Sequence, residues 1–226
     1  MPRVKAVFFD VDNTLFPTSK FAALARRNAV RAMVEAGLNY EEGLLFSKLN
    51  RVVHDYGANY NAHFNRLLET LGEPENPRAI AAGIVAYHNT KASLLPYPEV
   101  PRVLVSLKEN GYKIYAFSEG TPIKQWDKII RLGISFLLDD VFVCSEKKSS
   151  EYSKVLGKLK LKPSSCVMVG DRLEKDIKPA REAGMKTVRV MRGKYAAEEK
   201  DYRADYRVEN LVGLQAVLKK MGGKRK

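Results

Sequence analysis

Cysteine is scarce in this sequence, and long hydrophobic runs are absent. The two cysteines, Cys144 and Cys166, each lie in an apolar run with no metal-ligating partner at a short spacing, so we expect buried, reduced thiols. No apolar run approaches the roughly 20 residues that a membrane-spanning helix needs, so we expect no contact with a membrane. The N-terminus, Met1–Lys5, lacks an apolar signal core followed by a small-residue cleavage site, so we expect a cytoplasmic protein.

Acidic residues are outnumbered by basic ones. The chain has 26 Asp and Glu against 39 Lys and Arg, which gives a formal net charge of +13. Such a charge is typical of nucleic-acid binding or of attraction for small anions. Apart from the block at Lys219–Lys226, however, the basic residues are spread along the chain, with no nucleic-acid motif and no interleaved aromatic residues. We therefore interpret the charge as a solvated basic surface, which argues against a nucleic-acid partner.

The composition, with 45% hydrophobic and 29% charged residues, is that of a globular chain and excludes a disordered one. Short apolar runs rich in β-branched or aromatic residues predict buried strands at 4–9, 113–117, 141–144, 166–169 and 187–190. Helical patterns lie between them at about 100–110, 122–132, 151–159 and 175–183, and glycine follows three of these four. Strands that alternate with helices predict an α/β fold with a parallel sheet covered by helices on both faces.

The segment from about Thr18 to Leu95 interrupts this alternation, because it contains no convincing strand. Apolar residues instead recur at the three- and four-residue spacing of amphipathic helices. The four stripes are Phe21, Leu24, Ala25, Asn28 and Ala32; Leu45, Leu49, Val52 and Tyr56; Phe64, Leu67, Leu68 and Leu71; and Ile80, Ile84 and Tyr87. They predict a small all-helical domain inserted after the first strand. We place this domain at 17–95 and the core domain at 1–16 and 96–226, with proline at both junctions.

Polar residues follow the predicted strands, at the edge where open parallel sheets bind ligands. The segments are Asp10-Val11-Asp12-Asn13-Thr14, Ser118-Glu119-Gly120-Thr121, Ser145-Glu146-Lys147-Lys148 and Gly170-Asp171, the last followed by Asp176. Carboxylates, hydroxyls and lysines therefore converge on one rim. Three carboxylates close together cannot all remain ionised without a cation, and oxygen ligands suit Mg²⁺.

A lysine and a serine on the same rim suit an anionic group that the metal also touches, which favours phosphoryl transfer. Asp10 and Asp12 are two residues apart, so both side chains would point to one face if the strand stayed regular as far as Asp12. One carboxylate would then attack phosphorus while the other handles protons.

The segments Asp10-x-Asp12-x-Thr14, Ser118, Lys147 and Gly170-Asp171-(x4)-Asp176 resemble the four motifs of the haloacid dehalogenase superfamily in order and spacing. The resemblance covers nearly the whole chain, and the helical insert resembles the helical cap of that family. It implies a Rossmann-like core with a cap domain. It also implies a Mg²⁺-dependent phosphatase that hydrolyses a small phosphorylated metabolite, of the sugar, triose or glycolate phosphate class, through an aspartyl-phosphate.

The same resemblance implies a role for each site residue. Asp10 would be the nucleophile, and Asp12 would protonate the leaving alcohol and then activate the water that releases phosphate. Thr14 would support the loop or help to hold Asp12. Substrate binding would involve Ser118, Glu119, Gly120 and Lys147, and Lys147 would also neutralise charge during catalysis. Metal binding would involve Asp10, Asp12 through its carbonyl, Asp171 and Asp176, the last through water or by orienting the other ligands.

Two positions complicate the resemblance. Glu119 stands where relatives usually carry asparagine, so its acid must point away from the phosphate or meet a basic group. In the third motif, the spacing to Tyr152 and Leu156 favours Lys147, with the neighbouring Lys148 as the alternative.

Other functions stay open at this point. A phosphomutase or a nucleotidase of the same superfamily would keep the same aspartates. A metal-free haloacid dehalogenase would lack the second aspartate of the first motif, so the presence of Asp12 argues against it. The polar, aromatic stretch His54–His63 of the helical insert is a candidate for substrate selection, because binding residues concentrate in such loops. The sequence carries no signal of the oligomeric state.

Overall fold

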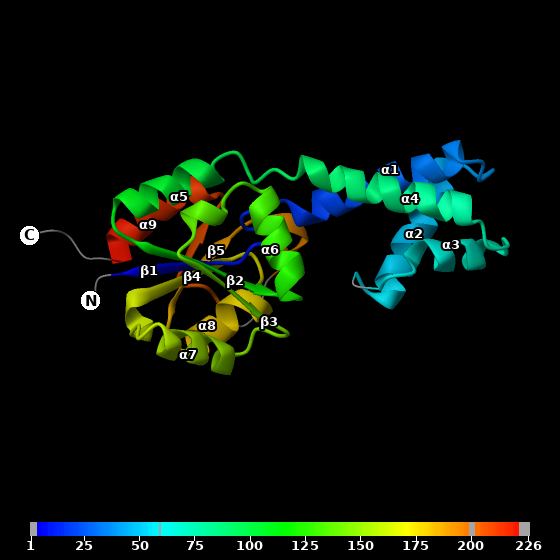
Figure 1. The fold of residues 1–226 in the computed structure, drawn as a ribbon. Helices are drawn as coiled ribbons and strands as arrows, with labels where there is room; N and C mark the ends of the chain where they lie inside the picture. The colour runs from blue at the N-terminus through cyan, green and yellow to red at the C-terminus, as the bar shows by residue number, and fades with distance from the viewer. Residues whose placement is uncertain (1–3, 59, 199–201, 222–226) are drawn as a thin grey trace, which may run out of the picture. The chain divides into compact units, whose positions relative to one another are not determined.

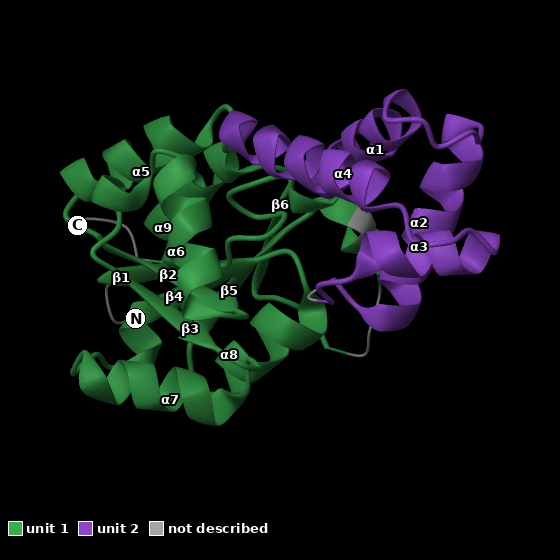
Figure 2. Cartoon of the chain, turned by 45° about the vertical axis from the view of Figure 1, so that its right-hand side comes forward, with its two compact units in different colours: residues 1–19, 95–226 green, residues 20–94 purple. Residues whose placement is uncertain are grey.

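The protein forms two compact units (Figure 2). The computed structural model describes residues 4–58, 60–198 and 202–221. Unit 1 comprises residues 1–19 and 95–226, and unit 2 comprises residues 20–94, so the second unit is an insertion into the first. Among the described helices, none is long and apolar enough to span a membrane.

Unit 1 is built on a parallel sheet, with six strands in the described residues in the order β3-β2-β1-β4-β5-β6. The strands are β1 Ala6–Phe9, β2 Lys113–Glu119, β3 Asp140–Cys144, β4 Cys166–Gly170, β5 Lys186–Val190 and β6 Tyr206–Val208. β1 lies in the interior of the sheet, between β2 and β4. All of its residues are buried, as expected for a strand covered on both faces.

Helices cover both faces of this sheet (Figure 1). α5 and α9 lie on one side, and α7 and α8 lie on the other. The helices of unit 1 are α5 Val100–Glu109, α6 Pro122–Arg131, α7 Ser149–Lys158, α8 Lys178–Glu182 and α9 Leu214–Met221, with short turns at Ser135–Leu137, Pro163–Ser165, Leu173–Ile177, Gly193–Tyr195 and Leu211–Gly213. The predicted α/β class, with a parallel sheet and a helical insert after the first strand, is confirmed.

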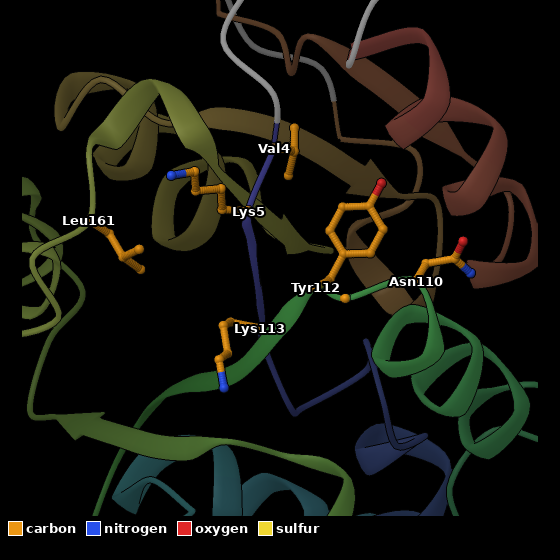
Figure 3. A pocket seen from close by; sticks show the side chains of 7 residues that line it. Val4, Lys5, Asn110, Tyr112, Lys113 and Leu161 are labelled. Atoms are coloured by element: carbon orange, nitrogen blue, oxygen red, sulfur yellow. The ribbon is translucent and has the colours of Figure 1, made fainter. Parts of the chain in front are cut away.

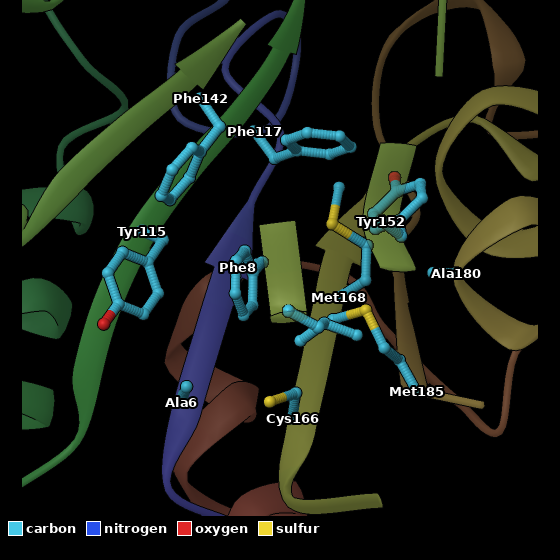
Figure 4. Packing of buried hydrophobic residues seen from close by; sticks show 11 residues of the cluster. Ala6, Phe8, Tyr115, Phe117, Phe142, Tyr152, Cys166, Met168, Ala180 and Met185 are labelled. Carbon is cyan, nitrogen blue, oxygen red and sulfur yellow. The ribbon is translucent and has the colours of Figure 1, made fainter. Parts of the chain in front are cut away.

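An aromatic core lies between one face of the sheet and helices α7 and α8 (Figure 4). The ring centroids of Phe8 and Tyr115 are 4.9 Å apart, and those of Phe117 and Tyr152 are 4.4 Å apart. Because side chains alternate along a strand, Phe8 of β1 and Phe117 of β2 face this core. The packing therefore fixes the carboxyl ends of β1 and β2, where the candidate site residues follow, against α7.

Unit 2 is helical and has its own core. Its helices are α1 Thr18–Glu35, which begins at the end of unit 1, α2 Glu42–Tyr56, α3 His63–Leu71 and α4 Pro77–Thr90, followed by a turn at Lys91–Ser93. Side-chain caps fix two of these helices, because Glu41 accepts hydrogen bonds at the start of α2 and Asn76 accepts one at the start of α4. The core contains Val30, Met33, Leu38, Leu45, Leu49, Leu67, Leu68, Ala79 and Ile80.

The predicted core stripe on α1 is wrong at Leu24, which is 50% exposed. The buried face of α1 consists instead of Ala25, Ala29, Val30 and Met33. Gly83 of α4 leaves room for Met33 on this face, because a Cβ there would lie only 2.9 Å from Cγ of Met33. Hydrophobicity alone favoured Leu24, whereas the structure buries the face of α1 that carries Ala25 and Ala29.

The predictions that Tyr56 and Ile84 face the core are also wrong, because these residues are 44% and 41% exposed. Tyr56 is the last residue of α2 and joins a surface cluster instead. Its ring centroid is 5.0 Å from that of Tyr60, and the Arg66 guanidinium lies 4.8 Å from its ring. These contacts fall in or beside the candidate stretch His54–His63, of which residue 59 lies outside the described residues.

Two elements near the C-terminus, β6 and α9, were not predicted from the sequence pattern. β6 has three residues, too few for an alternation to be visible, and it pairs with β5 at the edge of the sheet. α9 buries Leu214, Leu218 and Met221. Of the predicted basic block Lys219–Lys226, residues 222–226 lie outside the described residues.

Both cysteines are free thiols, as expected. Cys166 is fully buried, and burial raises the pKa of its thiol to about 11. Cys144 is only half-buried, because its strand β3 lies at the edge of the sheet, so the prediction of a buried thiol is wrong for this residue.

Candidate active site

The loop after β1 starts with a buried aspartate. Asp10 donates its backbone N–H to the carbonyl of Val169 on β4 (2.9 Å), and its side chain is buried. The strand does not continue to Asp12, because β1 ends at Phe9 and Asn13 adopts a left-handed conformation with φ of 60°. The regular-strand geometry considered for Asp10 and Asp12 is therefore wrong, and the two carboxylates have different surroundings.

The segment after β4 brings two more aspartates to the same edge of the sheet. Asp171 follows the last residue of β4, and Asp176 lies in a single π-helical turn, Leu173–Ile177. A Cβ on Gly170 would overlap the Asp176 carboxylate, so the glycine permits this close approach. The backbone N–H of Arg172 donates to Asp176 Oδ2 (3.0 Å), which fixes the side chain.

Asp10, Asp171 and Asp176 form one buried cluster, in which a carboxylate oxygen of each lies within 4.8 Å of the others. Burial, followed by repulsion from Asp10 and Asp176, raises the pKa of Asp171 to about 8. Burial also raises the pKa of Asp10, although the nearby Lys147 opposes this rise. Without a bound cation, these two carboxyls would therefore keep their protons to a higher pH than ordinary carboxyls do.

Lys147 reaches this cluster from the loop after β3. Its Nζ lies 2.5 Å from Asp10 Oδ1 and 2.6 Å from Asp176 Oδ1, and its side chain is 2% exposed. Burial alone would lower the pKa of Lys147, but Asp10 and Asp176 raise it well above its ordinary value. Lys148, the sequence alternative, is 66% exposed and pairs with Glu146 instead. The structure brings Lys147, and not Lys148, to the aspartates.

The cluster fits a divalent cation. Both carboxylate oxygens of Asp171 are buried and have no hydrogen-bond partner among the described residues. One lysine cannot balance three carboxylates, and a buried carboxylate without a partner is strongly disfavoured. An oxygen-only donor set that carries this much negative charge suits a hard metal ion.

Ser118 and Thr14 contribute buried hydroxyls. Ser118 lies near the carboxyl end of β2, beside β1, and is 1% exposed. Neither the Ser118 Oγ nor the Thr14 Oγ1 has a hydrogen-bond partner among the described residues. An unpartnered buried hydroxyl is costly in an apolar setting and is available to a bound anion.

Glu119 contacts a basic group, which is one of the two arrangements expected from the sequence. Its Oε1 accepts a hydrogen bond from the backbone N–H of Lys147 (2.7 Å) and lies 3.2 Å from Nζ of Lys175. Gly120 donates its N–H to the carbonyl of Cys144 (2.9 Å). The Glu119 carboxylate and the Gly120 N–H are thus already hydrogen-bonded within the protein, and they connect the end of β2 to the loop after β3.

The Asp12 carboxylate lies outside the acidic cluster and has its own partners. Thr18 Oγ1 and Lys128 Nζ both donate to its Oδ1, the latter over 2.5 Å. Thr18 and Lys128 were not predicted as site residues from the sequence, because neither belongs to a strand-end motif. The Gln125-x-x-Lys128 spacing on α6 was the available signal, since it places both side chains on one helix face.

An open pocket also lies at the amino ends of the strands, opposite the acidic cluster (Figure 3). Its lining includes Lys5, Tyr112 and Lys113. These residues lie at the beginnings of β1 and β2, whereas the aspartates follow strand ends. The pocket is therefore separate from the acidic cluster and contains none of the predicted site residues.

Lys147→Ala is expected to reduce kcat by at least about 100-fold, because it removes the cation that contacts Asp10. It is also expected to cost about 3–5 kcal/mol of stability, since two buried carboxylates lose their partner. Lys148→Ala is the matched control and should leave kcat within about twofold, as expected for an exposed pair. Steady-state kinetics and thermal unfolding check both effects. The reverse order of the two variants would transfer the role to Lys148.

Together, the fold and the site define an α/β protein with a helical insert and a buried acidic centre at the carboxyl edge of its sheet. The family profile described as haloacid dehalogenase-like hydrolase matches residues 4–184. The chain belongs to this family, which confirms the predicted resemblance.

Full-length relatives agree with this assignment. The chain is 42% identical to a glyceraldehyde 3-phosphate phosphatase of Methanocaldococcus jannaschii, covering 96% of this chain and 98% of the relative. It is 47% identical to a glyceraldehyde 3-phosphate phosphatase of Methanopyrus kandleri, covering 85% and 86%. A solved haloacid dehalogenase-like hydrolase from Xanthomonas campestris has a TM-score of 0.69 at 22% identity, covering 97% of this chain and 92% of that one, which supports the fold.

Proposed function

We propose that this chain is a Mg²⁺-dependent phosphatase that hydrolyses glyceraldehyde 3-phosphate through an aspartyl-phosphate at Asp10. The observation that carries the proposal is the buried Asp10–Lys147 pair beside the partnerless carboxylate of Asp171. The curated phosphatases that share more than 40% of their residues with this chain support the reaction and the substrate. The phosphatase class expected from the sequence motifs agrees with them.

Mg²⁺ would be held by carboxylate oxygens of Asp10 and Asp171 and by the backbone carbonyl of Asp12. When bound, it would offset the carboxylate charge and draw electron density from the phosphoryl group. Asp171 supports this assignment most strongly, because its two oxygens have no partner among the described residues. Asp176 is held by Lys147 and the Arg172 N–H, so it would orient the site or bind through water.

Asp10 would act as the nucleophile. Lys147 donates to its Oδ1, and among the described residues no hydrogen bond reaches Oδ2, which would attack phosphorus. The new bond joins Asp10 to phosphorus while the bond from phosphorus to the substrate oxygen breaks. Asp12 would give a proton to the departing alkoxide, so that glyceraldehyde leaves as the neutral alcohol.

A water molecule would then complete the reaction. Asp12, now ionised, would take a proton from the water as its oxygen attacks phosphorus, and the Asp10–phosphorus bond would break to give inorganic phosphate and free Asp10. The unpartnered hydroxyl of Ser118 would donate to the phosphoryl oxygens in both steps. The buried Thr14 would support the loop that carries both aspartates.

Mg²⁺ is expected to stabilise the protein more at about pH 8 than at about pH 6. The folded, metal-free protein holds a proton on Asp171 up to about pH 8, whereas the unfolded chain releases it near 3.8. Stability without metal therefore falls as the pH rises between these values. At the higher pH about half of the molecules have released this proton, so protons compete with the metal less than at pH 6, and Mg²⁺ at about 100 times its Kd should raise Tm by about 5–10 °C.

Thermal unfolding in EDTA and in Mg²⁺, at both pH values, measures this difference. Asp171→Asn is the control, because it lacks the titrating group and should show little effect of Mg²⁺ at either pH. An equal rise in Tm at the two pH values for the unsubstituted protein would contradict the assignment of Asp171 as a ligand.

A substrate panel tests the proposed function directly. Phosphate release from glyceraldehyde 3-phosphate would be compared with release from phosphoglycolate, a hexose phosphate and a nucleoside monophosphate, with Mg²⁺ present. We expect kcat/KM for glyceraldehyde 3-phosphate to exceed the others by about tenfold or more, with equal amounts of glyceraldehyde and phosphate formed. A higher value for another ester would reject the substrate. Isomerised sugar phosphate without free phosphate would instead indicate the phosphomutase alternative.

A further inference from the structure

Helix α6 carries a hydrogen-bonded chain that ends on the Asp12 carboxylate. Lys128 Nζ lies 2.5 Å from Asp12 Oδ1 and donates to Oε1 of Gln125 over 3.1 Å. The Nε2 of Gln125 donates in turn to the carbonyl of Glu119 over 2.9 Å. The loop after β2 is thereby connected to the loop after β1 through two side chains of one helix.

The surroundings hold this chain in place. Gln125 is 7% exposed, and the Lys128 side chain is 19% exposed. Gly120 has a φ of 129°, and a Cβ there would lie 3.1 Å from Nε2 of Gln125, so the glycine makes room for the amide. Fixing the amide leaves its Oε1 directed at Lys128, which limits the rotamers open to the lysine.

Both donors to Asp12 contact the same oxygen. Thr18 Oγ1 and Lys128 Nζ each donate to Oδ1, and no hydrogen bond reaches Oδ2 among the described residues. A carboxyl group held by one oxygen cannot rotate freely, so Oδ2 remains as the oxygen that exchanges protons. A proton donor fixed in one orientation is more effective than one that samples several.

We propose that Lys128, held by Gln125, is a positioning residue that anchors Asp12 by Oδ1 and directs Oδ2 toward the leaving oxygen. The inference rests on the proposed phosphatase reaction, in which Asp12 supplies the proton for the departing alkoxide. Lys128 forms no bond with the substrate in this arrangement. Its loss therefore matters in proportion to how much the leaving group needs a proton.

The test compares three phosphate esters by kcat/KM, which reports the steps up to departure of the alcohol. p-Nitrophenolate leaves without a proton, and phenolate leaves less readily. The alkoxide of glyceraldehyde, which leaves from glyceraldehyde 3-phosphate, needs a proton most. For Lys128→Met, we expect a loss of less than about threefold with p-nitrophenyl phosphate, an intermediate loss with phenyl phosphate and about 100-fold with glyceraldehyde 3-phosphate. Gln125→Leu should show the same order with smaller losses.

Lys154→Met is the matched control, because Lys154 is an exposed lysine on α7, and all three ratios should stay at the level of the unsubstituted protein. Equal losses of Lys128→Met with all three esters would overturn the inference, as would a loss confined to glyceraldehyde 3-phosphate with both aryl esters unaffected. Gln125→Leu decides in the same way if Lys128→Met does not fold. The proposed function fails separately, if the unsubstituted protein hydrolyses none of the esters.

Discussion

Asp10→Asn is expected to abolish turnover while leaving the fold intact. The amide keeps the shape of the carboxylate but cannot form the phosphoryl ester, so kcat should fall by at least about 10⁴-fold. The substitution also removes one of three buried carboxylates that repel one another. We therefore expect Tm in EDTA to be unchanged or higher, although Lys147 loses one of its two ionic partners. Phosphate release and thermal unfolding measure the two effects.

The control for this prediction is Asp127→Asn on α6. Asp127 is a half-buried aspartate that pairs with Arg131, and it should retain activity within about twofold. A rate within tenfold of the unsubstituted protein for Asp10→Asn would contradict the assignment of the nucleophile. Loss of the folded transition in Asp10→Asn would instead show that the carboxylate is needed for the fold.

Removal of divalent metal is also expected to abolish activity. Without a cation, burial and mutual repulsion keep the carboxyls of Asp171 and Asp10 protonated up to about neutral pH. A protonated Asp10 is a poor nucleophile, and the phosphoryl charge would have only Lys147 as a nearby cationic partner from the cluster. Assays in EDTA should show a loss of at least about 10³-fold, reversed by excess Mg²⁺.

Ca²⁺ provides a control with the same charge. It prefers longer bonds and more ligands than Mg²⁺, so it should bind without restoring the full rate. Activity that persists after exhaustive chelation would contradict a metal-dependent reaction and would return the metal-free alternative to consideration.

Much of the site could be predicted because its residues follow strands in the sequence. The carboxyl ends of parallel strands lie side by side, so the sequence alone predicts that Asp10, Lys147 and Asp171 lie together. Lys147 was separable from Lys148 by its spacing to Tyr152, and the structure buries Tyr152 and Lys147 on the same side of β2. The order of the strand-end motifs along the chain and the topology of the parallel sheet were together sufficient to predict these positions.

The contacts of Asp12 could not be predicted in the same way. Lys128 reaches it from α6, 116 positions along the chain, and only the packing of that helix on the sheet brings the two together. The buried face of α1 was also missed, since hydrophobicity favoured Leu24, whereas the structure buries Ala29 and Met33 instead, with Met33 against Gly83 of α4. Periodicity predicts that a helix has a buried face, but the neighbouring element decides which face is buried.

Calorimetric titration of the metal-stripped protein with Mg²⁺ tests most directly whether the buried aspartates form a metal centre. Three variants of the chain would be compared: unsubstituted, Asp171→Asn and Asp12→Asn. The Asp12 carboxylate lies outside the cluster and its backbone carbonyl survives the change, so Asp12→Asn is the matched control. We expect one Mg²⁺ per chain for the unsubstituted protein and for Asp12→Asn, with affinity reduced at least about 100-fold in Asp171→Asn. Equal affinity in Asp171→Asn, or no binding to the unsubstituted protein, would contradict the metal centre.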